Sequence, residues 1–479
     1  MADAGTAGTR LVVLGGGPGG YAAAFLAAEL GMDVTLVDEG ERPGGVCLYR
    51  GCIPSKTLLH VAATIHEARA AAGWGVRFEP PEIDLAALRA HKDKIVNQLT
   101  NGLALIAKNR KVRFIQGRGR FTSPTSLHVR RESELAEIDF DYAIIATGSR
   151  PAVPGPLRID SPRVMDSTGA LELADIPERL LVVGGGYIGL EMGTVYASLG
   201  SRVTVVEMLD GLLPGADRDL VRPLQRKLEA EFSAIMLNTR VAGMVEAEDG
   251  IEAQLEDGDG KSSTQTFDKV LVAVGRVPNT QDLGLEITSV PVNERGFIGV
   301  DAQRRTAEPT IFAIGDVAGE PMLAHKATRE GRVAAEAIAG QPTVFEPAAI
   351  PAVVFTDPEL AWCGLTESQA DEQREIDFDV VKIPWGASGR AITMGHPEGL
   401  TKLIIEQGSG RLLGVGIAGA NAGELIGEAT LAVEMGARAK DLELTIHAHP
   451  TLAETIMETA ESLYGQATHY LNKPVVKRH

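Results

Sequence analysis

The chain has 479 residues, of which 44% are hydrophobic and 23% charged, as is typical of a globular protein. Its 46 Lys and Arg against 64 Asp and Glu give a net charge of −18, which argues against nucleic-acid binding because phosphate affinity needs clustered basic side chains. Its three cysteines exclude a secreted disulfide scaffold, and no apolar run reaches the ~20 residues that span a bilayer. We expect about three domains and a cytoplasmic protein without a membrane partner. Residues 1–10 show no leader pattern, although a processed organellar protein would look the same.

The N-terminal region predicts a dinucleotide-binding unit. An apolar strand, a glycine-rich turn, an Ala-rich helix and a second strand follow one another at residues 10–14, 15–20, 21–30 and 34–37. Gly15, Gly17 and Gly20 fit the pattern GxGxxG, whose glycines make the turn, admit a pyrophosphate and pack the helix on the strand. Asp38 stands 21 residues after Gly17 and can accept hydrogen bonds from a ribose. A glycine turn with a structural role alone is the alternative.

Cys47 and Cys52 follow this unit and indicate a redox-active thiol pair beside a bound cofactor. Residues five apart on an ideal helix have Cα atoms roughly 8–9 Å apart, whereas a disulfide needs about 4.4–6.8 Å. The segment must therefore be irregular if the two thiols pair. Gly51 permits this, and we expect Pro54 to push Ile53 out of the helical region. Two buried apolar cysteines are the alternative.

A second unit of the same kind begins at residue 180. Its strand, glycine-rich turn, helix and second strand lie at residues 180–183, 184–189, 190–198 and 203–206, and its glycines are Gly184, Gly186 and Gly189. Glu207 again stands 21 residues after the middle glycine. A carboxylate here should bind the ribose 2′-hydroxyl and repel a 2′-phosphate, and residues 208–210 supply no arginine. The second site should therefore prefer NAD to NADP.

Weaker signals follow in the second half of the chain. The apolar strand at 310–314 ends in Gly315-Asp316, which fits either a ligand-binding strand end or a plain turn. Apolar alternation at residues 353–355 and 401–405 and a long helix around 422–435 predict a further α+β region. Cys363 is interpreted as a small core residue.

His449 is a candidate base near the C-terminus. It precedes Pro450, so its backbone should be extended. Thr451 and Glu454 form a capping box for the following helix, with Thr451 as its N-cap. Glu454 can also orient the imidazole, because a carboxylate has two oxygens. A dithiol-oxidising enzyme needs such a base, since the thiolate is the nucleophile.

Together these segments resemble the flavoprotein disulfide reductases, the class I pyridine nucleotide-disulfide oxidoreductases, from residue 11 to about residue 464. The carriers are GGVCLYRGCIPSK (44–56), AIIATGSRP (143–151), VVGGGYIGLEMG (182–193), AVGRVPN (273–279), FAIGD (312–316), PMLAHK (321–326) and HAHPTLAE (447–454). The resemblance implies an α/β fold with two Rossmann-like domains, for FAD and NAD, and a C-terminal α+β interface (dimerisation) domain. The implied domains are FAD-binding at 1–150, NAD-binding at 151–279, a central domain completing the FAD site at 280–348 and the interface domain at 349–479.

The resemblance also implies which residues form the sites, with no metal among their ligands. FAD would contact Gly15, Gly17, Gly20, Asp38, Lys56, Gly119, Thr147, Gly148, Asp316 and Ala324. NAD would contact Gly184, Gly186, Tyr187, Ile188, Gly189, Glu207, Val241, Ala273, Gly275 and Arg276. The catalytic residues would be Cys47, Cys52, His449, Glu454, Lys56 and Glu191. Lys56 and Glu191 would form an ion pair near the flavin, and His447 would have a structural role.

The implied activity is oxidation of dihydrolipoyl groups carried by a separate acyltransferase subunit of 2-oxo acid dehydrogenase complexes. Electrons would pass through the Cys47–Cys52 disulfide and FAD to NAD+. Cys47 would exchange with the substrate and Cys52 would face the flavin. His449 would act on the disulfide of the opposite subunit, so the resemblance implies a homodimer.

Other activities of the same family fit the residues less well. A glutathione-reductase type would need arginines near Glu207, and mercuric reductases normally carry a further C-terminal cysteine pair, whereas no cysteine follows Cys363. Soluble transhydrogenases lack the first thiol, which is present here as Cys47.

Tyr187 stands where a smaller aliphatic residue is usual in the family and could gate NAD entry. A mainly structural subunit docked on a multienzyme core is the alternative from another class, and the acidic balance would suit a basic partner.

Overall fold

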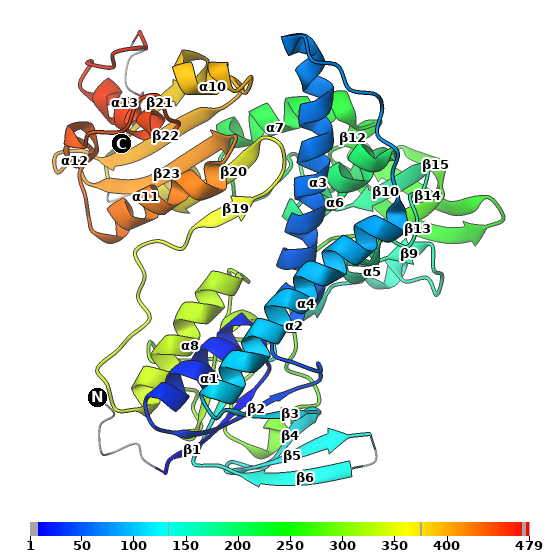
Figure 1. The fold of residues 1–479 in the computed structure, drawn as a ribbon, viewed down its shortest axis with the longest axis vertical. Coiled ribbons are helices and arrows are strands. Elements are labelled where there is room, and N and C mark those ends of the chain that lie inside the picture. Colours follow the sequence, from blue (N-terminus) through cyan, green and yellow to red (C-terminus); the bar gives the residue numbers. More distant parts are fainter. Residues whose placement is uncertain (1–7, 133, 374–375, 472–475, 479) are drawn as a thin grey trace.

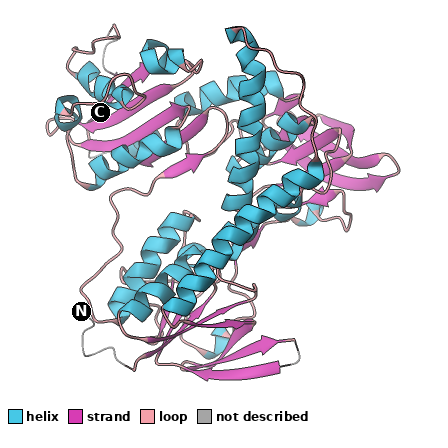
Figure 2. Ribbon diagram, viewed as in Figure 1, coloured by secondary structure: helices cyan, strands magenta, loops and turns pink. Residues whose placement is uncertain are grey.

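The computed structural model describes residues 8–132, 134–373, 376–471 and 476–478 (Figure 1). Residues 1–7, which belong to the segment without a leader pattern in the sequence, lie outside this range. Helices and strands gather in three regions, which lie at the bottom, right and upper left of Figure 2. Among the described residues, no helix is long and apolar enough to cross a membrane.

The first region is built on a parallel sheet with the order β18-β7-β1-β2-β3. Its elements are β1 (Arg10–Leu14), α1 (Pro18–Glu29), β2 (Asp33–Asp38), β3 (Arg113–Gln116), β7 (Tyr142–Ile145), β18 (Ile311–Ala313) and α8 (Ala324–Ile338). In the register, Leu11 lies opposite both Val34 and Tyr142. β18 pairs with β7, and α8 packs against α1 (Figure 1). The segment expected as a central domain therefore contributes a strand and a helix to the N-terminal unit.

An antiparallel sheet and three helices are also formed by the N-terminal part of the chain. The sheet contains β4 (Arg118–Ser123), β5 (Ser126–Arg131) and β6 (Glu134–Asp139), and the helices are α2 (Gly45–Arg50), α3 (Cys52–Ala70) and α4 (Leu85–Asn109). In Figure 1, α4 runs from the bottom region toward the right-hand region, and α3 rises toward the top of the view beside the right-hand region, where it packs on a helix of the second region. The helix that begins at Cys52 is thus in contact with both nucleotide-binding units.

The second region repeats the first, with a parallel sheet in the order β12-β11-β10-β16-β9. Its elements are β9 (Val164–Met165), α5 (Ser167–Glu172), β10 (Arg179–Val183), α6 (Tyr187–Leu199), β11 (Arg202–Val206), α7 (Arg218–Glu231), β12 (Ala234–Met236) and β16 (Lys269–Val272). An antiparallel sheet of β13 (Thr239–Ala247), β14 (Gly250–Asp257) and β15 (Ser262–Phe267) adds to it. A ribbon of β8 (Ser149–Pro151) and β17 (Arg276–Pro278) connects the two regions. The central strands are almost wholly apolar because helices and loops bury both of their faces.

The third region is α+β, with one sheet in the order β19-β20-β23-β22-β21-β24. The strands are β19 (Ala352–Val354), β20 (Glu359–Gly364), β21 (Phe378–Pro384), β22 (Leu400–Glu406), β23 (Leu412–Gly419) and β24 (Val476–Arg478). The helices are α9 (Glu367–Glu372), α10 (Gly389–Thr393), α11 (Ala422–Glu434), α12 (Ala439–Leu444) and α13 (Glu454–Leu463). Cys363 is 1% exposed in the core between this sheet and α11, in agreement with its expected role.

Candidate active site

The two glycine-rich turns have the same geometry. Gly15 (φ +112°) and Gly184 (φ +110°) lie in a region that favours glycine, and a Cβ at either position would lie within 2.5 Å of a backbone oxygen. Gly20 and Gly189 let α1 and α6 approach the turns, since their Cβ atoms would lie 1.8 and 2.2 Å from the Gly15 and Gly184 carbonyl oxygens. Each turn therefore presents a helix N-terminus, where backbone N–H groups can bind a phosphate.

The acids predicted to bind ribose are held in the same way in both units. Asp38 accepts hydrogen bonds from the backbone N–H of Gly16 at 2.6 Å and of Gly40 at 2.7 Å. Glu207 accepts from Gly185 at 2.6 Å and from Leu209 at 2.8 Å. Each carboxylate oxygen takes one N–H and keeps lone pairs for further donors. The acids are thus oriented by the glycine turns themselves and still have capacity for a ribose hydroxyl.

A cavity of about 550 Å³ lies at the first turn and extends to α6 of the second region. Its lining includes every residue expected to contact FAD except Gly20, which packs beneath the turn. Cys47, Cys52, Lys56 and Glu191 line the same cavity. The structure therefore brings four of the expected catalytic residues to the predicted flavin site.

Cys47 and Cys52 lie on either side of a break between two helices. Cys47 is in α2, Cys52 begins α3, and Gly51 between them has φ −147° and ψ −117°, outside the helical region. The expected irregularity is present at this glycine. The expectation for Ile53 is wrong, because Ile53 is helical. Pro54 falls in the first turn of α3, where its missing N–H breaks no intrahelical hydrogen bond.

The two thiols, both free, are electrostatically unequal. The Cys47 thiol donates a hydrogen bond to the Cys52 sulfur, and this contact together with the charge of Lys56 lowers the pKa of Cys52 to about 7. The same contact, together with burial, raises the pKa of Cys47 above its usual value. A thiolate therefore forms first on Cys52.

Lys56 and Glu191 form the ion pair that the resemblance implied. Their Nζ and Oε2 atoms are 2.7 Å apart, with Glu191 3% and Lys56 30% exposed. Glu191 also accepts hydrogen bonds from Ser55 Oγ at 3.3 Å and from the Phe355 backbone at 3.0 Å. Tyr187 lies on the same cavity wall and is 40% exposed. The pair thus connects the two nucleotide-binding regions with the start of the third.

The predicted base is on the third region. His449 Nδ1 lies 2.9 Å from Glu454 Oε1, while Glu454 Oε2 accepts the Thr451 N–H at 2.8 Å, so the carboxylate has both expected partners. The N-cap expectation is wrong: α13 begins at Glu454, and the Thr451 hydroxyl donates to the Ala448 carbonyl instead. Burial raises the pKa of Glu454, whereas the hydrogen bonds from Thr451 and His449 lower it. The net result is a pKa below the usual value. The His449 side chain is 72% exposed and does not line the cavity.

Comparison with known proteins identifies the family of the chain. A family model described as pyridine nucleotide-disulphide oxidoreductase matches residues 9–331, and one described as the dimerisation domain of the same family matches residues 350–460. The chain belongs to the pyridine nucleotide-disulphide oxidoreductase family. It is 49% identical to dihydrolipoyl dehydrogenase from Vibrio parahaemolyticus over 98% of each chain, and 49% identical to that from Haemophilus influenzae over 96% of each. The solved structure of LpdA from Mycobacterium tuberculosis has a TM-score of 0.88 and 28% identity, over 95% of this chain and 99% of that one.

Membership of this oxidoreductase family confirms the expected fold class and the use of FAD and NAD(H). The glycine turn with an open side at Gly17, the acid at the end of β2 and the carboxylate of Asp316 across the cavity fit an FAD. The residues expected to contact NAD divide into two groups. Tyr187, Ile188 and Arg276 line the cavity, whereas the others lie outside its lining, and Val241 packs against the core of the second sheet. The individual contacts remain predictions.

Sequence reasoning missed Ser149 in the family's ATGS segment. Its hydroxyl donates to Asp316 Oδ2 and accepts from Arg276 Nε at 2.7 Å, and its carbonyl accepts from the same guanidinium at 2.7 Å. Next to it, Thr147 donates to the Asn279 carbonyl at 2.7 Å, and the Asn279 amide donates back to Thr147 at 3.0 Å. A polar serine that is only 2% exposed links the expected FAD and NAD residues. Its position directly after Gly148 was the one available signal.

His447 has the structural contacts that were expected of it. Its Nε2 lies 2.7 Å from Glu428 Oε1 and its Nδ1 lies 3.0 Å from the Thr445 carbonyl oxygen. Its side chain is 5% exposed, in contrast to that of His449. The family's dimerisation domain thus presents one histidine held within the chain and one directed outwards.

Proposed function

We propose that the chain is a dihydrolipoyl dehydrogenase, which oxidises a dihydrolipoyl group to lipoyl disulfide and reduces NAD+ to NADH. One observation carries this proposal: Cys47 and Cys52 line the cavity of the first glycine turn together with the Lys56–Glu191 pair. The names of the relatives at 49% identity support the choice of substrate. Glu207, 7% exposed and held by its glycine turn, supports NAD as the acceptor.

In the proposed reaction the histidine base accepts the proton, and the two cysteines accept the electrons. His449 of the partner subunit takes a proton from a dihydrolipoyl thiol, and the resulting thiolate attacks Cys47 Sγ. In the oxidised enzyme, where the two cysteines form a disulfide, this attack breaks the Cys47–Cys52 bond, and Cys52 leaves as the thiolate that its lowered pKa favours. The second substrate thiol then displaces Cys47 to form lipoyl disulfide, so the enzyme dithiol holds the two electrons. FAD, when bound, would carry the two electrons from this dithiol to NAD+, and the overall reaction would release NADH and one proton.

The assignment of the base requires a homodimer. His449 is exposed and is not among the residues that line the cavity of its own chain, and it belongs to the family's dimerisation domain. A second subunit would place it opposite Cys47. The lipoyl group would arrive on the acyltransferase subunit of a 2-oxo acid dehydrogenase complex.

Anaerobic stopped-flow mixing of the yellow holoenzyme with dihydrolipoamide, then with NAD+ or NADP+, tests the proposal. We expect rapid appearance of a long-wavelength thiolate–flavin band, followed by NADH formation that is selective for NAD+. The variant Cys363→Ala should behave like the wild type, because this third cysteine is buried in another core. Full reduction by NADH without any reduction by dihydrolipoamide would refute the proposed substrate while retaining the flavoprotein.

A further inference from the structure

The loop between Glu207 and α7, residues 208–216, packs directly on the second glycine turn. The Leu213 N–H donates to the Gly185 carbonyl at 2.9 Å, and the Leu209 N–H donates to Glu207 at 2.8 Å. Leu212 is fully buried, and its Cδ2 would lie 2.7 Å from a Cβ on Gly185. The position of this loop therefore influences both the turn and the acid predicted to bind the adenosine ribose.

Arg218, the first residue of α7, holds the end of this loop. Its guanidinium donates to three loop carbonyls, those of Leu212 at 2.7 Å, Leu213 at 2.7 Å and Ala216 at 2.6 Å. These bonds make the loop and the start of α7 one unit, because a planar guanidinium fixes the relative positions of its acceptors. The position of the first turn of α7 therefore fixes the position of the loop.

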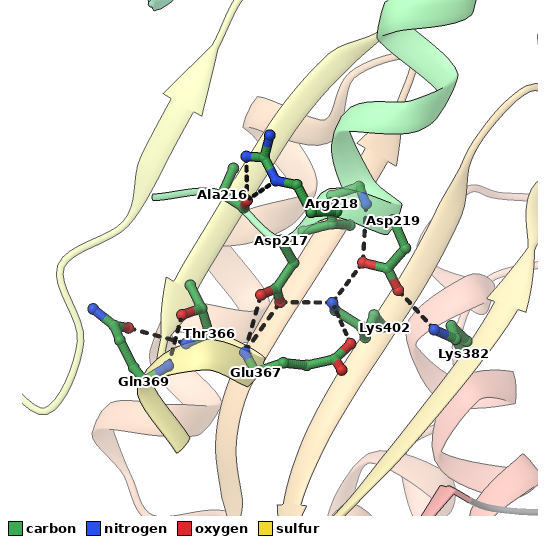
Figure 3. Close-up of polar contacts among 10 residues, drawn as sticks. Ala216, Asp217, Arg218, Asp219, Thr366, Glu367, Gln369, Lys382 and Lys402 are labelled. Carbon is green, nitrogen blue, oxygen red and sulfur yellow. Dashed lines mark hydrogen bonds and ion pairs between the residues drawn. The ribbon is translucent and has the colours of Figure 1, made fainter. Parts of the chain in front are cut away.

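The start of α7 is anchored to the third region by a buried lysine. Lys402 of β22 is 1% exposed, and its Nζ lies 2.6 Å from Asp217 Oδ2, 2.7 Å from Asp219 Oδ1 and 2.8 Å from Glu367 Oε1 (Figure 3). Asp217 also accepts the Glu367 N–H at 3.0 Å. We call Lys402, Asp217, Asp219 and Glu367 the lysine cluster.

The carboxylate oxygens of the lysine cluster lie close enough to one another to bind a metal ion. The Lys402 ammonium already takes the position of a cation among them. Burial works against its charge, but Asp219 and Asp217 raise the pKa of Lys402 above its usual value. The cluster is therefore a charged contact between two domains.

We propose that Lys402 is a positioning residue for the adenosine end of NAD, acting from the dimerisation domain through Asp217, Arg218 and the loop 208–216. The inference rests on the proposed use of NAD at the second turn. Without the ammonium, three carboxylates face one another, the start of α7 moves away, and the loop no longer holds Gly185 and Glu207 in place. Dihydrolipoamide, which reacts at Cys47, should be unaffected.

Lys402→Met in the holoenzyme tests this proposal. We expect binding of ADP-ribose, measured by calorimetry, to weaken about tenfold, which corresponds to ~1.4 kcal/mol. The KM for NAD+ should rise similarly, while kcat at saturating NAD+ and the KM for dihydrolipoamide stay the same. Lys382→Met is the matched control, because Lys382 contacts the same Asp219 at 2.7 Å but is 44% exposed, and exposed pairs contribute little.

The outcomes separate this proposal from the proposed function. Folded Lys402→Met with unchanged ADP-ribose binding would show a purely structural role and overturn the inference, as would equal effects in Lys382→Met. If Lys402→Met does not fold, Asp217→Asn gives the same comparison, because it removes one charge of the lysine cluster without changing its shape. A wild-type enzyme that binds no ADP-ribose would refute the proposed NAD site itself.

Discussion

Replacing Cys47 by alanine removes the hydrogen bond that contributes most to the lowered pKa of Cys52. The pKa of this thiol falls from 9.0 to about 7, and one pH unit corresponds to ~1.36 kcal/mol. A hydrogen bond to a charged acceptor contributes ~1.5–3 kcal/mol. Cys47→Ala should therefore raise the pKa of Cys52 by about one to two pH units, to between about 8 and 9.

The thiolate–flavin band of the holoenzyme reports this pKa directly. A thiol is ionised above its pKa, so the band is present at high pH and disappears as the pH falls through the pKa of Cys52. In the two-electron-reduced wild type the midpoint should lie near pH 7, and in oxidised Cys47→Ala it should lie about one to two pH units higher. Cys52→Ser should show no band at any pH, whereas Cys47→Ser should retain one.

Lys56→Met provides the comparison that can refute this reasoning. Lys56 also lowers the pKa of Cys52, but by less than the Cys47 thiol does. Its removal should move the midpoint upwards by a smaller amount. A midpoint that stays near 7 in Cys47→Ala, or a larger displacement in Lys56→Met, would show that the hydrogen bond is not the dominant cause.

Three further predictions concern the base, the nucleotide and its access. His449→Gln should lower kcat for dihydrolipoamide by about 10²–10⁴-fold, as expected for loss of a general base, and Glu454→Gln by less. NADH oxidation by ferricyanide should persist in both, and its equal loss would contradict the assignment. Glu207→Gln, which keeps the shape but removes the charge, should raise the ratio of kcat/KM for NADP+ over NAD+ by about tenfold, and an unchanged ratio would exclude charge as the selector. Tyr187→Ile should speed reoxidation of the reduced enzyme by NAD+ in stopped flow, because Tyr187 stands on the cavity wall, and an unchanged rate would exclude a gate.

Local spacing was enough to predict the nucleotide turns and the pairing of His449 with Glu454. The GxGxxG pattern indicates a tight turn between a strand and a helix. A carboxylate five residues after a histidine can reach its imidazole once Pro450 prevents a continuous helix. The same local reasoning was wrong for Ile53 and for Thr451 as N-cap. In both cases the position of the residue relative to the helix start decided the outcome, and helix starts are set by packing as well as by sequence.

The sequence by itself determined the two nucleotide-binding units, their acids and the candidate thiols, because each depends on residues close together in the chain. Only the tertiary structure placed Ser149 between Arg276 and Asp316, which are 127 and 167 residues away from it. It also placed two carboxylates of another domain beside Lys402, those of Asp217 and Asp219, the second of them 183 residues distant. Such contacts join side chains across domain boundaries, and no periodicity or motif encodes them, since they exist only when separately folded elements pack together.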